Sequence, residues 1–213
     1  MNGCRVCLSS TAERYQTVRE RDYWRCGTCK AVFLEHSQIP DAVDEHQRYL
    51  LHNNDPSDPG YVRFVRRLAE PLLQRLEPCR EGLDFGCGPG PALPRIAAEA
   101  GHTVRLYDPF FYPDQEALNV TYDFVVCSEV AEHFHWPARE FSRLNALLRP
   151  GGWLAVGTCF AVEDRDFADW HYRRDPTHVV FYQPETFRHL ASRFGMDCEI
   201  PARNVALLQK RKS

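Results

Sequence analysis

The feature that most constrains this chain is a glycine-rich turn, residues 86–90, which reads Gly-Cys-Gly-Pro-Gly. Residues 82–85 before it predict a short strand. The residues after it predict a helix up to Ala100, ended by Gly101. Glycines permit a tight bend and a close approach of ligand to backbone, and a helix N-terminus offers N–H groups to that ligand. In an open α/β sheet, a nucleotide-like cofactor binds at such a turn.

The rest of the chain after this turn alternates between strand-like and helix-like segments. Strands are predicted at 103–107, 122–127, 153–159 and 204–209, and helices at 137–148 and 184–194. Such alternation is typical of a parallel sheet with helices on both faces. The predicted fold class is therefore α/β, a Rossmann-like doubly wound and mostly parallel sheet. Clustered cysteines near the N-terminus add a small zinc ribbon to this prediction.

Three zones divide the sequence. Residues 1–35 carry four clustered cysteines, residues 36–78 form a polar connector followed by a helical lid, and residues 79–213 form the α/β domain. The apolar spacing in the second zone predicts a helix over 61–76, with Asp58 as its N-cap. Pro71 interrupts that pattern, so we expect a kink or a break into two helices there.

Two Cys-x-x-Cys pairs lie in the first zone, Cys4 with Cys7 and Cys26 with Cys29. Pairs at this separation predict a tetrahedral structural zinc site with four thiolate ligands. A segment this short buries little apolar surface, so the metal would supply most of its folding energy. Redox or disulfide pairing is the weaker alternative, and four thiolates leave no open position for catalysis.

Five further cysteines are scattered through the chain and are interpreted as small buried hydrophobic residues: Cys79, Cys87, Cys127, Cys159 and Cys198. The formal net charge of -3 argues against a dominant nucleic-acid surface, and no DNA partner is expected. Apolar runs are too short for a membrane helix, and the N-terminus lacks the apolar stretch of a signal peptide. These observations predict a cytoplasmic protein without membrane partners.

The spacing around the turn distinguishes among cofactors. The glycines follow a Gly-x-Gly-x-Gly pattern rather than the Gly-x-Gly-x-x-Gly of dinucleotide sites. Asp84 precedes the first glycine by two residues, and Asp108 ends the next strand. This arrangement resembles motif I of class I S-adenosylmethionine-dependent methyltransferases. The segments 128–134, 147–154 and 173–182 resemble further motifs of that family in the right order, over roughly residues 80–210.

The resemblance implies methyl transfer from S-adenosylmethionine to an O, N or C acceptor. It also implies that Asp84 faces the methionyl ammonium and that Asp108 bonds the ribose hydroxyls. The implied cofactor-binding residues are Asp84, Gly86, Cys87, Gly88, Gly90, Asp108, Pro109, Phe110 and Glu129, with Tyr49 and His52 from the connector. The connector residues would close over the cofactor as a lid; the alternative is an inert linker.

One departure from the family concerns its third strand, which usually carries an acid or amide for the adenine. Residues 109–121 replace that strand with a short loop. We expect the adenine to stack on Phe110 or Phe111, with Asp114 nearby. These aromatic residues could equally cover the edge of the sheet.

The acceptor would lie beside two loops at the carboxyl ends of the strands. His133 and His178 are the candidates for a catalytic base or an acceptor clamp, and the family also uses such histidines to tie loops together. Arg173 and Arg174 would hold a carboxylate or phosphate of the substrate, or be solvated loop charges. His171 would line the pocket or pack within its loop.

Three functions follow from these residues. The leading hypothesis is methyl transfer to a small molecule. The second keeps the chemistry but has an RNA or protein substrate, with the ribbon as the reader and with stacking on its aromatic residues Tyr15, Tyr23, Trp24 and Phe33. We prefer the interpretation that these aromatics fold or dock the ribbon. The third hypothesis is a non-catalytic regulatory protein that binds S-adenosylmethionine.

Overall fold

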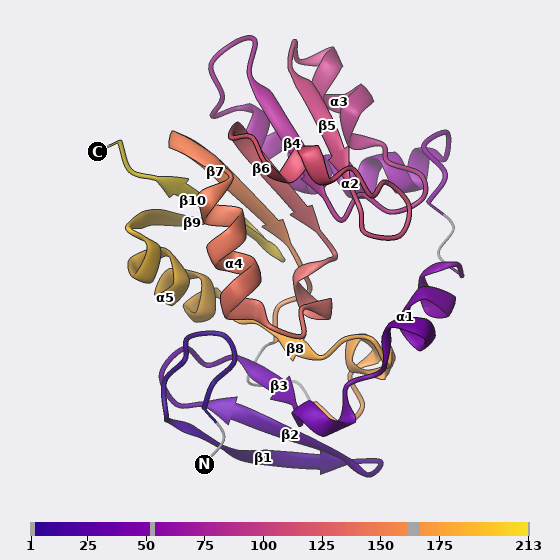
Figure 1. Ribbon diagram of the computed structural model, residues 1–213, viewed down its shortest axis with the longest axis vertical. Coiled ribbons are helices and arrows are strands. Elements are labelled where there is room, and N and C mark those ends of the chain that lie inside the picture. The colour runs from indigo at the N-terminus through magenta and orange to yellow at the C-terminus, as the bar shows by residue number, and fades with distance from the viewer. Residues whose placement is uncertain (1–2, 52–53, 162–166, 213) are drawn as a thin grey trace.

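The computed structural model describes residues 3–51, 54–161 and 167–212, and two sheets organise them (Figure 1). The large sheet contains β4 (Glu81–Phe85), β5 (Thr103–Tyr107), β6 (Tyr122–Ser128), β7 (Leu148–Gly157), β9 (Met196–Ala202) and β10 (Val205–Lys210). The small sheet contains β1 (Ala12–Val18), β2 (Arg21–Cys26), β3 (Val32–Leu34) and β8 (Val180–Phe181). The helices are α1 (Ala42–Tyr49), α2 (Pro59–Leu73), α3 (Leu93–Glu99), α4 (Pro137–Ala146) and α5 (Pro184–Phe194).

The large sheet has the strand order β5-β4-β6-β7-β10-β9. Its first four strands are parallel, whereas β10 runs antiparallel to both β7 and β9. The predicted mostly parallel sheet is therefore confirmed. Strand β9 was not predicted, because its exposed and half-buried residues alternate without a clear apolar run.

Helices cover both faces of this sheet, as the doubly wound prediction requires. Alternate residues of β6 point to opposite sides, because side chains alternate along a strand. Phe124 and Val126 pack in a cluster with α2 and α3, while Val125 and Cys127 pack in a cluster with α4 and α5. The second cluster extends without interruption into the ribbon.

The strand that the sequence lacks is also absent from the described residues of the sheet. After β5 the chain forms a single bridge between Asp108 and Tyr112, and then a 3₁₀ turn at Gln115–Leu118. Strand β5 is consequently one edge of the sheet. Arg105 on β5 donates to the carboxylate of Asp114, which holds the replacement loop against that edge.

The helix α2 corrects one prediction and confirms another. The Asp58 carboxylate caps it by accepting from the N–H groups of Gly60 and Tyr61. The break at Pro71 does not occur, because α2 continues through it as one helix that ends at Leu73, earlier than the predicted end at 76; a kink there stays a prediction. Pro71 lies close to the C-terminus of α2, and only two helical residues follow it. The helix α1 within the connector was not predicted.

Two other expectations need correction. The predicted helix over 137–148 ends at Ala146, because Leu148 is already part of β7 and pairs there with Tyr122 of β6. A register shift after this pair accommodates the turn residues that follow Leu148. Among the five scattered cysteines, Cys87 and Cys127 are buried as expected, but Cys159 and Cys198 are half-buried and Cys79 is exposed. Among the described residues, no helix combines the length and apolar character needed to cross a bilayer.

The ribbon joins the α/β domain through its sheet. Strand β3 pairs with β8, with Phe33 opposite Val180, so a strand from the distant part of the sequence completes the ribbon. Figure 1 shows this small sheet beside the ends of β6 and α4, with α1 at the margin between ribbon and large sheet. Tyr23 and Phe33 are buried at this junction, as the docking interpretation predicts.

Candidate active site

The glycine-rich turn connects β4 to α3 and is fixed to the end of β5. The N–H groups of Gly86 and Cys87 both donate to the carbonyl of Tyr107, at 2.7 and 3.2 Å. Gly86 has a φ of 78°, and a Cβ there would lie 2.6 Å from the side chain of Val130. Only glycine meets both requirements without strain, which explains this residue at the bend.

Two buried acids lie against the turn. The Oδ2 of Asp108 accepts from Gly88 N–H at 3.0 Å, and its Oδ1 accepts from the N–H groups of Phe110 and Phe111 at 2.9 and 3.1 Å. A carboxylate has about four acceptor sites, so Oδ2 is the oxygen with more room for a ligand hydroxyl. Burial, with the nearby charge of Asp108, raises the pKa of Asp84 to about 7.

Both acids line a large cavity with a volume of about 930 Å³. It extends from the turn to the ends of β5 and β6 and under α1 and α2. The predicted cofactor residues that line it are Tyr49, Asp84, Gly86, Cys87, Gly88, Asp108, Pro109, Phe110 and Glu129. Gly90 instead faces the connector, because a Cβ there would lie 1.7 Å from the carbonyl oxygen of Asn54. His52 lies outside the described residues.

Helix α1 covers one side of the cavity with rings. His46 stacks on Phe110 with ring centroids 4.8 Å apart and an interplanar angle of 6°. Tyr49 contacts Phe110 at 5.7 Å and meets His133 edge to face at 5.2 Å. Burial raises the pKa of the Tyr49 hydroxyl, so this phenol stays protonated at neutral pH. Phe110 is therefore already in contact with aromatic neighbours at the position predicted for adenine stacking.

Two polar contacts fasten α1 to the rim. Arg48 donates from Nε and Nη2 to one carboxylate oxygen of Asp175, at 2.9 and 2.8 Å. Burial alone would raise the pKa of Asp175, but hydrogen bonds from Arg48 and Thr177 outweigh it and hold that pKa below its usual range. His135 Nε2 lies 2.8 Å from the carboxylate of Glu45.

The two candidate base histidines lie together on the cavity wall. Their ring centroids are 4.8 Å apart. The Nδ1 of His133 lies 3.0 Å from the carbonyl of Thr177, and the Nδ1 of His178 lies 2.7 Å from the carbonyl of Tyr172. Because a carbonyl only accepts, each Nδ1 donates to its carbonyl, and this contact fixes the orientation of each ring on the cavity wall.

Behind these rings two carboxylates converge on one phenol. The hydroxyl of Tyr172 lies 2.5 Å from Oε1 of Glu132, 3.1 Å from Oε2 of Glu129 and 3.1 Å from the hydroxyl of Thr158. Burial raises the pKa of Glu129 to about 7 and that of Glu132 well above its usual range. Glu129 also has a φ of 52°, a strained conformation of the kind found at functional sites.

Comparison with known proteins decides the family. Residues 51–199, well over half of the chain, match the family model described as a methyltransferase domain. The chain belongs to this methyltransferase family. With its fold, it is a class I S-adenosylmethionine-dependent methyltransferase, which confirms the resemblance found in the sequence. The search of curated proteins found no match.

Solved structures show the same fold at low identity. A Burkholderia thailandensis 1,6-didemethyltoxoflavin-N1-methyltransferase, with 1,6-didemethyltoxoflavin and S-adenosylhomocysteine bound, has a TM-score of 0.53 and 16% identity, covering 94% of this chain and 100% of that one. An Archaeoglobus fulgidus SAM-dependent methyltransferase has a TM-score of 0.54 and 17% identity, covering 80% and 100%. An O-methyltransferase family protein of Burkholderia thailandensis has a TM-score of 0.53 and 16% identity, covering 83% and 65%.

The four N-terminal cysteines of the methyltransferase gather at one point. Their sulfur atoms lie within 4.8 Å of one another, with 3.7 Å between Cys4 and Cys29 and 3.6 Å between Cys7 and Cys26. Sulfurs on one tetrahedral zinc ion, each about 2.3 Å from the metal, would be about 3.8 Å apart. N–H groups of Val6 and Cys7 donate to the Cys4 sulfur, and that of Cys29 donates to Cys26. The cluster therefore fits a tetrahedral metal ion.

The three residues predicted to hold the substrate lie outside the cavity lining of the methyltransferase. The guanidinium of Arg173 is buried and donates to the carbonyl of Ala168 and, at 3.5 Å, to the hydroxyl of Tyr23. Arg174 and His171 are exposed, and Arg174 donates to the carbonyl of Asp169. A direct substrate contact by these residues stays a prediction that the cavity lining does not support.

Some cavity residues of the methyltransferase escaped the sequence reasoning. Glu45, Asn54 and Tyr61 line it, and Tyr61 has its pKa raised to about 12 by burial and by the charge of Asp84. Asn54 lies in the connector just before α2, and Tyr61 lies in the first turn of that helix. They are far from the glycine-rich turn in sequence, and only their proximity to it in the folded chain reveals them.

Proposed function

We propose that this methyltransferase moves the methyl group of S-adenosylmethionine to a small-molecule acceptor held in the cavity. The observation that carries the proposal is the pair of buried acids, Asp84 and Asp108, beside the glycine-rich turn on the cavity wall. A buried carboxylate is costly unless it is paired, so Asp84 favours a cationic ligand group. Asp108, prearranged by three backbone N–H groups, suits ribose hydroxyls.

The chain's own residues divide the work. When bound, S-adenosylmethionine supplies an electrophilic methyl group on a sulfonium. Asp84 and Asp108 fix the two ends of the cofactor, and α1 excludes water from the side of Phe110. His133 and His178 both line the cavity, where they are positioned to take a proton from an oxygen or nitrogen acceptor. Holding the acceptor in line with the methyl group supplies a large part of the rate.

Several considerations favour a small acceptor. The cavity is within the size range of small-molecule sites, and Glu45 and Tyr49 of α1 line one side of it. The Burkholderia thailandensis N1-methyltransferase of the same fold holds a small heterocycle. For the ribbon, burial of Tyr23 and Phe33 supports a structural role over an RNA-stacking surface. We propose Zn²⁺ as the ion held by Cys4, Cys7, Cys26 and Cys29, on the sulfur spacing given above.

The test is calorimetric titration of the full chain with S-adenosylhomocysteine. Asp108→Ala should weaken binding by about 30- to 100-fold, since it removes a buried charged acceptor. Glu116→Ala is the matched control, because this exposed acid lies on the same loop outside the cavity lining. Unchanged affinity of Asp108→Ala would overturn the proposal. Salt-sensitive RNA binding lost with Cys26→Ser would favour a macromolecular substrate instead.

A further inference from the structure

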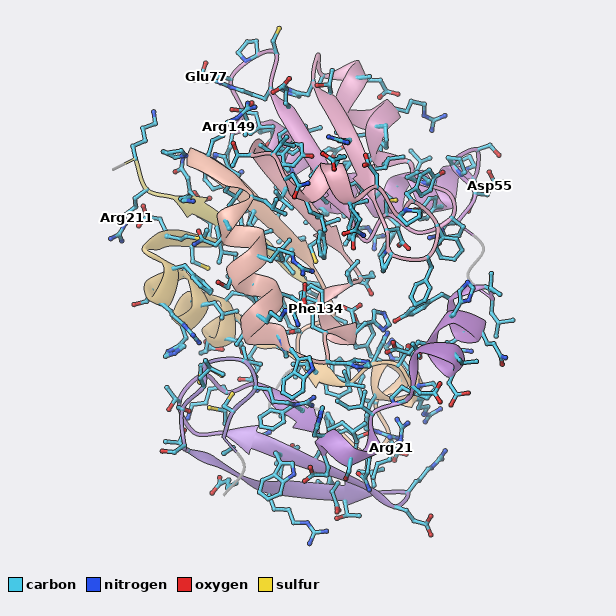
Figure 2. All side chains as sticks on the ribbon, viewed as in Figure 1. Arg21, Asp55, Glu77, Phe134, Arg149 and Arg211 are labelled. Carbon is cyan, nitrogen blue, oxygen red and sulfur yellow. The ribbon has the colours of Figure 1, made fainter. Side chains whose placement is uncertain are left out.

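The cavity has a wall that none of the predicted cofactor residues supplies. Phe134, His135 and Trp136, from the turn after β6, line it together with Glu140 and Arg143 of α4. Figure 2 shows Phe134 of this turn between the large sheet and the small sheet. The glycine-rich turn and the loop after β5 line other parts of the cavity and are assigned to the cofactor. The segment 134–143 is then left for the methyl acceptor, and we call it the acceptor wall.

The start of the acceptor wall is fastened to the ribbon through Arg5. The carbonyl of Arg5 accepts from the N–H of Ala138, in the first turn of α4, at 3.0 Å. Its guanidinium donates from Nη1 to the carbonyl of His135 at 3.0 Å and from Nη2 to the carbonyl of Leu34 at 2.6 Å. One residue of the ribbon therefore holds the turn, the helix and β3 together.

Helix α4 depends on this contact at its N-terminus. Trp136 is the N-cap residue, and no side-chain hydrogen bond caps the helix. Pro137 follows and has no N–H, so Ala138 carries the first N–H of the helix that needs a hydrogen-bond acceptor. The carbonyl of Arg5 is that hydrogen-bond acceptor and takes the place of the missing cap.

Stability alone explains the Arg5 side chain poorly. It is half-buried, and its buried Nε has no hydrogen-bond partner among the described residues. A buried donor left without a partner costs free energy, and an apolar side chain of similar volume would avoid that cost. What an apolar side chain cannot do is hold two carbonyls at fixed places, as a planar guanidinium does.

The thiolate cluster fixes the backbone of Arg5. This residue lies between Cys4 and Cys7, two of the proposed zinc ligands, and the N–H groups of Val6 and Cys7 donate to the Cys4 sulfur. With zinc bound, both ends of the segment 4–7 are attached to one ion, so the segment has little freedom. Loss of the ion frees this backbone and, with it, the carbonyl that caps α4.

We propose that Arg5 is a positioning residue, which holds residues 134–138 in place as the start of the acceptor wall and makes the order of this wall depend on the zinc. The inference rests on the proposed function, because that function assigns this wall to the methyl acceptor. Its consequence is a form of regulation. Loss of zinc disorders the acceptor wall and spares the glycine-rich turn, so the metal controls the acceptor end of the cavity more than the cofactor end.

The test is hydrogen exchange of the full chain with its zinc in place, read by mass spectrometry of peptides from two regions. Arg5→Met removes the charge and keeps a long side chain, so the fold should survive. Exchange at residues 134–140 should become at least about tenfold faster, the effect of losing a hydrogen bond from a charged donor. Residues 86–99, which cover the glycine-rich turn and α3, should exchange as in the wild type. Arg5→Lys, which keeps a charged donor, should lie between the two.

Arg25→Met is the matched control. Arg25 also lies next to a proposed zinc ligand, Cys26, but its guanidinium stacks on the ring of Tyr15 within the ribbon, 3.8 Å from the centroid. Exchange at residues 134–140 should therefore equal that of the wild type. Removal of zinc by a chelator should speed exchange at 134–140 in the wild type, and by a smaller factor in Arg5→Met, because both changes act on the same contact.

Equal exchange at residues 134–140 in the wild type and Arg5→Met would overturn the inference. An equal rise at residues 86–99 would do the same, since it would mean general destabilisation. If Arg5→Met does not fold, Arg5→Lys and zinc removal from the wild type decide the question on the same peptides.

The same samples are titrated with S-adenosylhomocysteine to separate this inference from the proposed function. The wild type and Arg5→Met should bind it with affinities within about threefold of each other, a difference below 1 kcal/mol. No binding by the wild type would sink the proposed function, whatever the exchange shows. Normal binding with unchanged exchange at residues 134–140 would sink only the role of Arg5.

Discussion

The ribbon and α1 are consecutive in the chain, yet they are attached to the α/β domain in different ways. The ribbon shares a hydrogen-bonded sheet with β8, and its buried Tyr23 packs edge to face on Phe167 and Phe181. Helix α1 buries one residue, Glu45, and is held by an ion pair, a carboxylate–imidazole contact and rings at the cavity rim. Apolar burial stabilises far more than partly exposed ion pairs do. The ribbon is thus part of the fold, and α1 is a cover.

The largest effect is expected from the thiolate cluster. Cys26→Ser should release the zinc and lower the Tm by about 10 °C, because a loss of about 4 kcal/mol corresponds to roughly 2–4 °C per kcal/mol in a chain of this size. Differential scanning calorimetry with zinc analysis measures both. Cys79→Ser, an exposed cysteine outside the cluster, is the control. A variant that loses zinc but melts with the wild type would mean that the ribbon is not part of the fold.

The next effect concerns the junction itself. Phe181→Ala removes a fully buried ring between ribbon and large sheet and should cost about 3–5 kcal/mol in the free energy of unfolding. The zinc content should stay at the wild-type value, because the aromatic neighbours of this ring are Tyr23, Phe167 and Trp170, and none of them belongs to the thiolate cluster. Urea denaturation gives the free energy, and Val120→Ala at an exposed position serves as the reference. Equal destabilisation of the two variants would show that the junction contributes little.

A smaller effect on stability, with a clear effect on binding, is expected for the cover. Arg48→Gln breaks the contact with Asp175, which is partly exposed and so contributes at most about 1 kcal/mol. The Tm should fall by less than about 4 °C. Affinity for S-adenosylhomocysteine should fall by about three- to tenfold, because the cover must then be ordered on binding. Arg14→Gln, which breaks an exposed ion pair within the ribbon, should leave affinity unchanged.

The pH dependence of binding separates the cover from the acids beneath it. Asp84, whose pKa is raised to about 7, must lose its proton to pair with the methionyl ammonium. Affinity should therefore rise with pH from about 5.5 to 7.5, a range in which the α-amino group keeps its proton. Calorimetry should find this rise in the wild type and in Arg48→Gln alike, and not in Asp84→Asn. A pH dependence lost with Arg48→Gln would assign the effect to the cover instead.

The same contrast explains what the sequence could predict. The glycine-rich turn, the parallel strands and the missing third strand follow from local patterns of glycine and apolar residues. Strand β8 has two residues, too few for a pattern, and exists because β3 lies beside it. Helix α1 is polar along most of its length, so no apolar periodicity marks it. Its N-cap is the adjacent Asp41, but the polar contacts that fasten it reach His135 and Asp175, which are 90 and 127 positions from their partners.

The candidate site divides along similar lines. Asp84 and Asp108 were predictable, because they flank a turn whose position in the sheet is fixed by topology. The convergence of Glu129 and Glu132 on Tyr172 was not, since it brings together residues some forty positions apart. Arg173 shows the limit of such local reasoning. A loop arginine suggests an anion, but this one is buried against a backbone carbonyl and a ribbon tyrosine.

The shortened connection after β5 has a further consequence. An edge strand presents unpaired N–H and C=O groups that can recruit a strand from another molecule, and proteins protect such edges with charge or with a covering loop. Here the ion pair between Arg105 on β5 and Asp114 on the loop places charge at the edge and also holds the covering loop against it. Breaking that pair would uncover a template for intermolecular pairing, so this exposed ion pair guards solubility rather than catalysis.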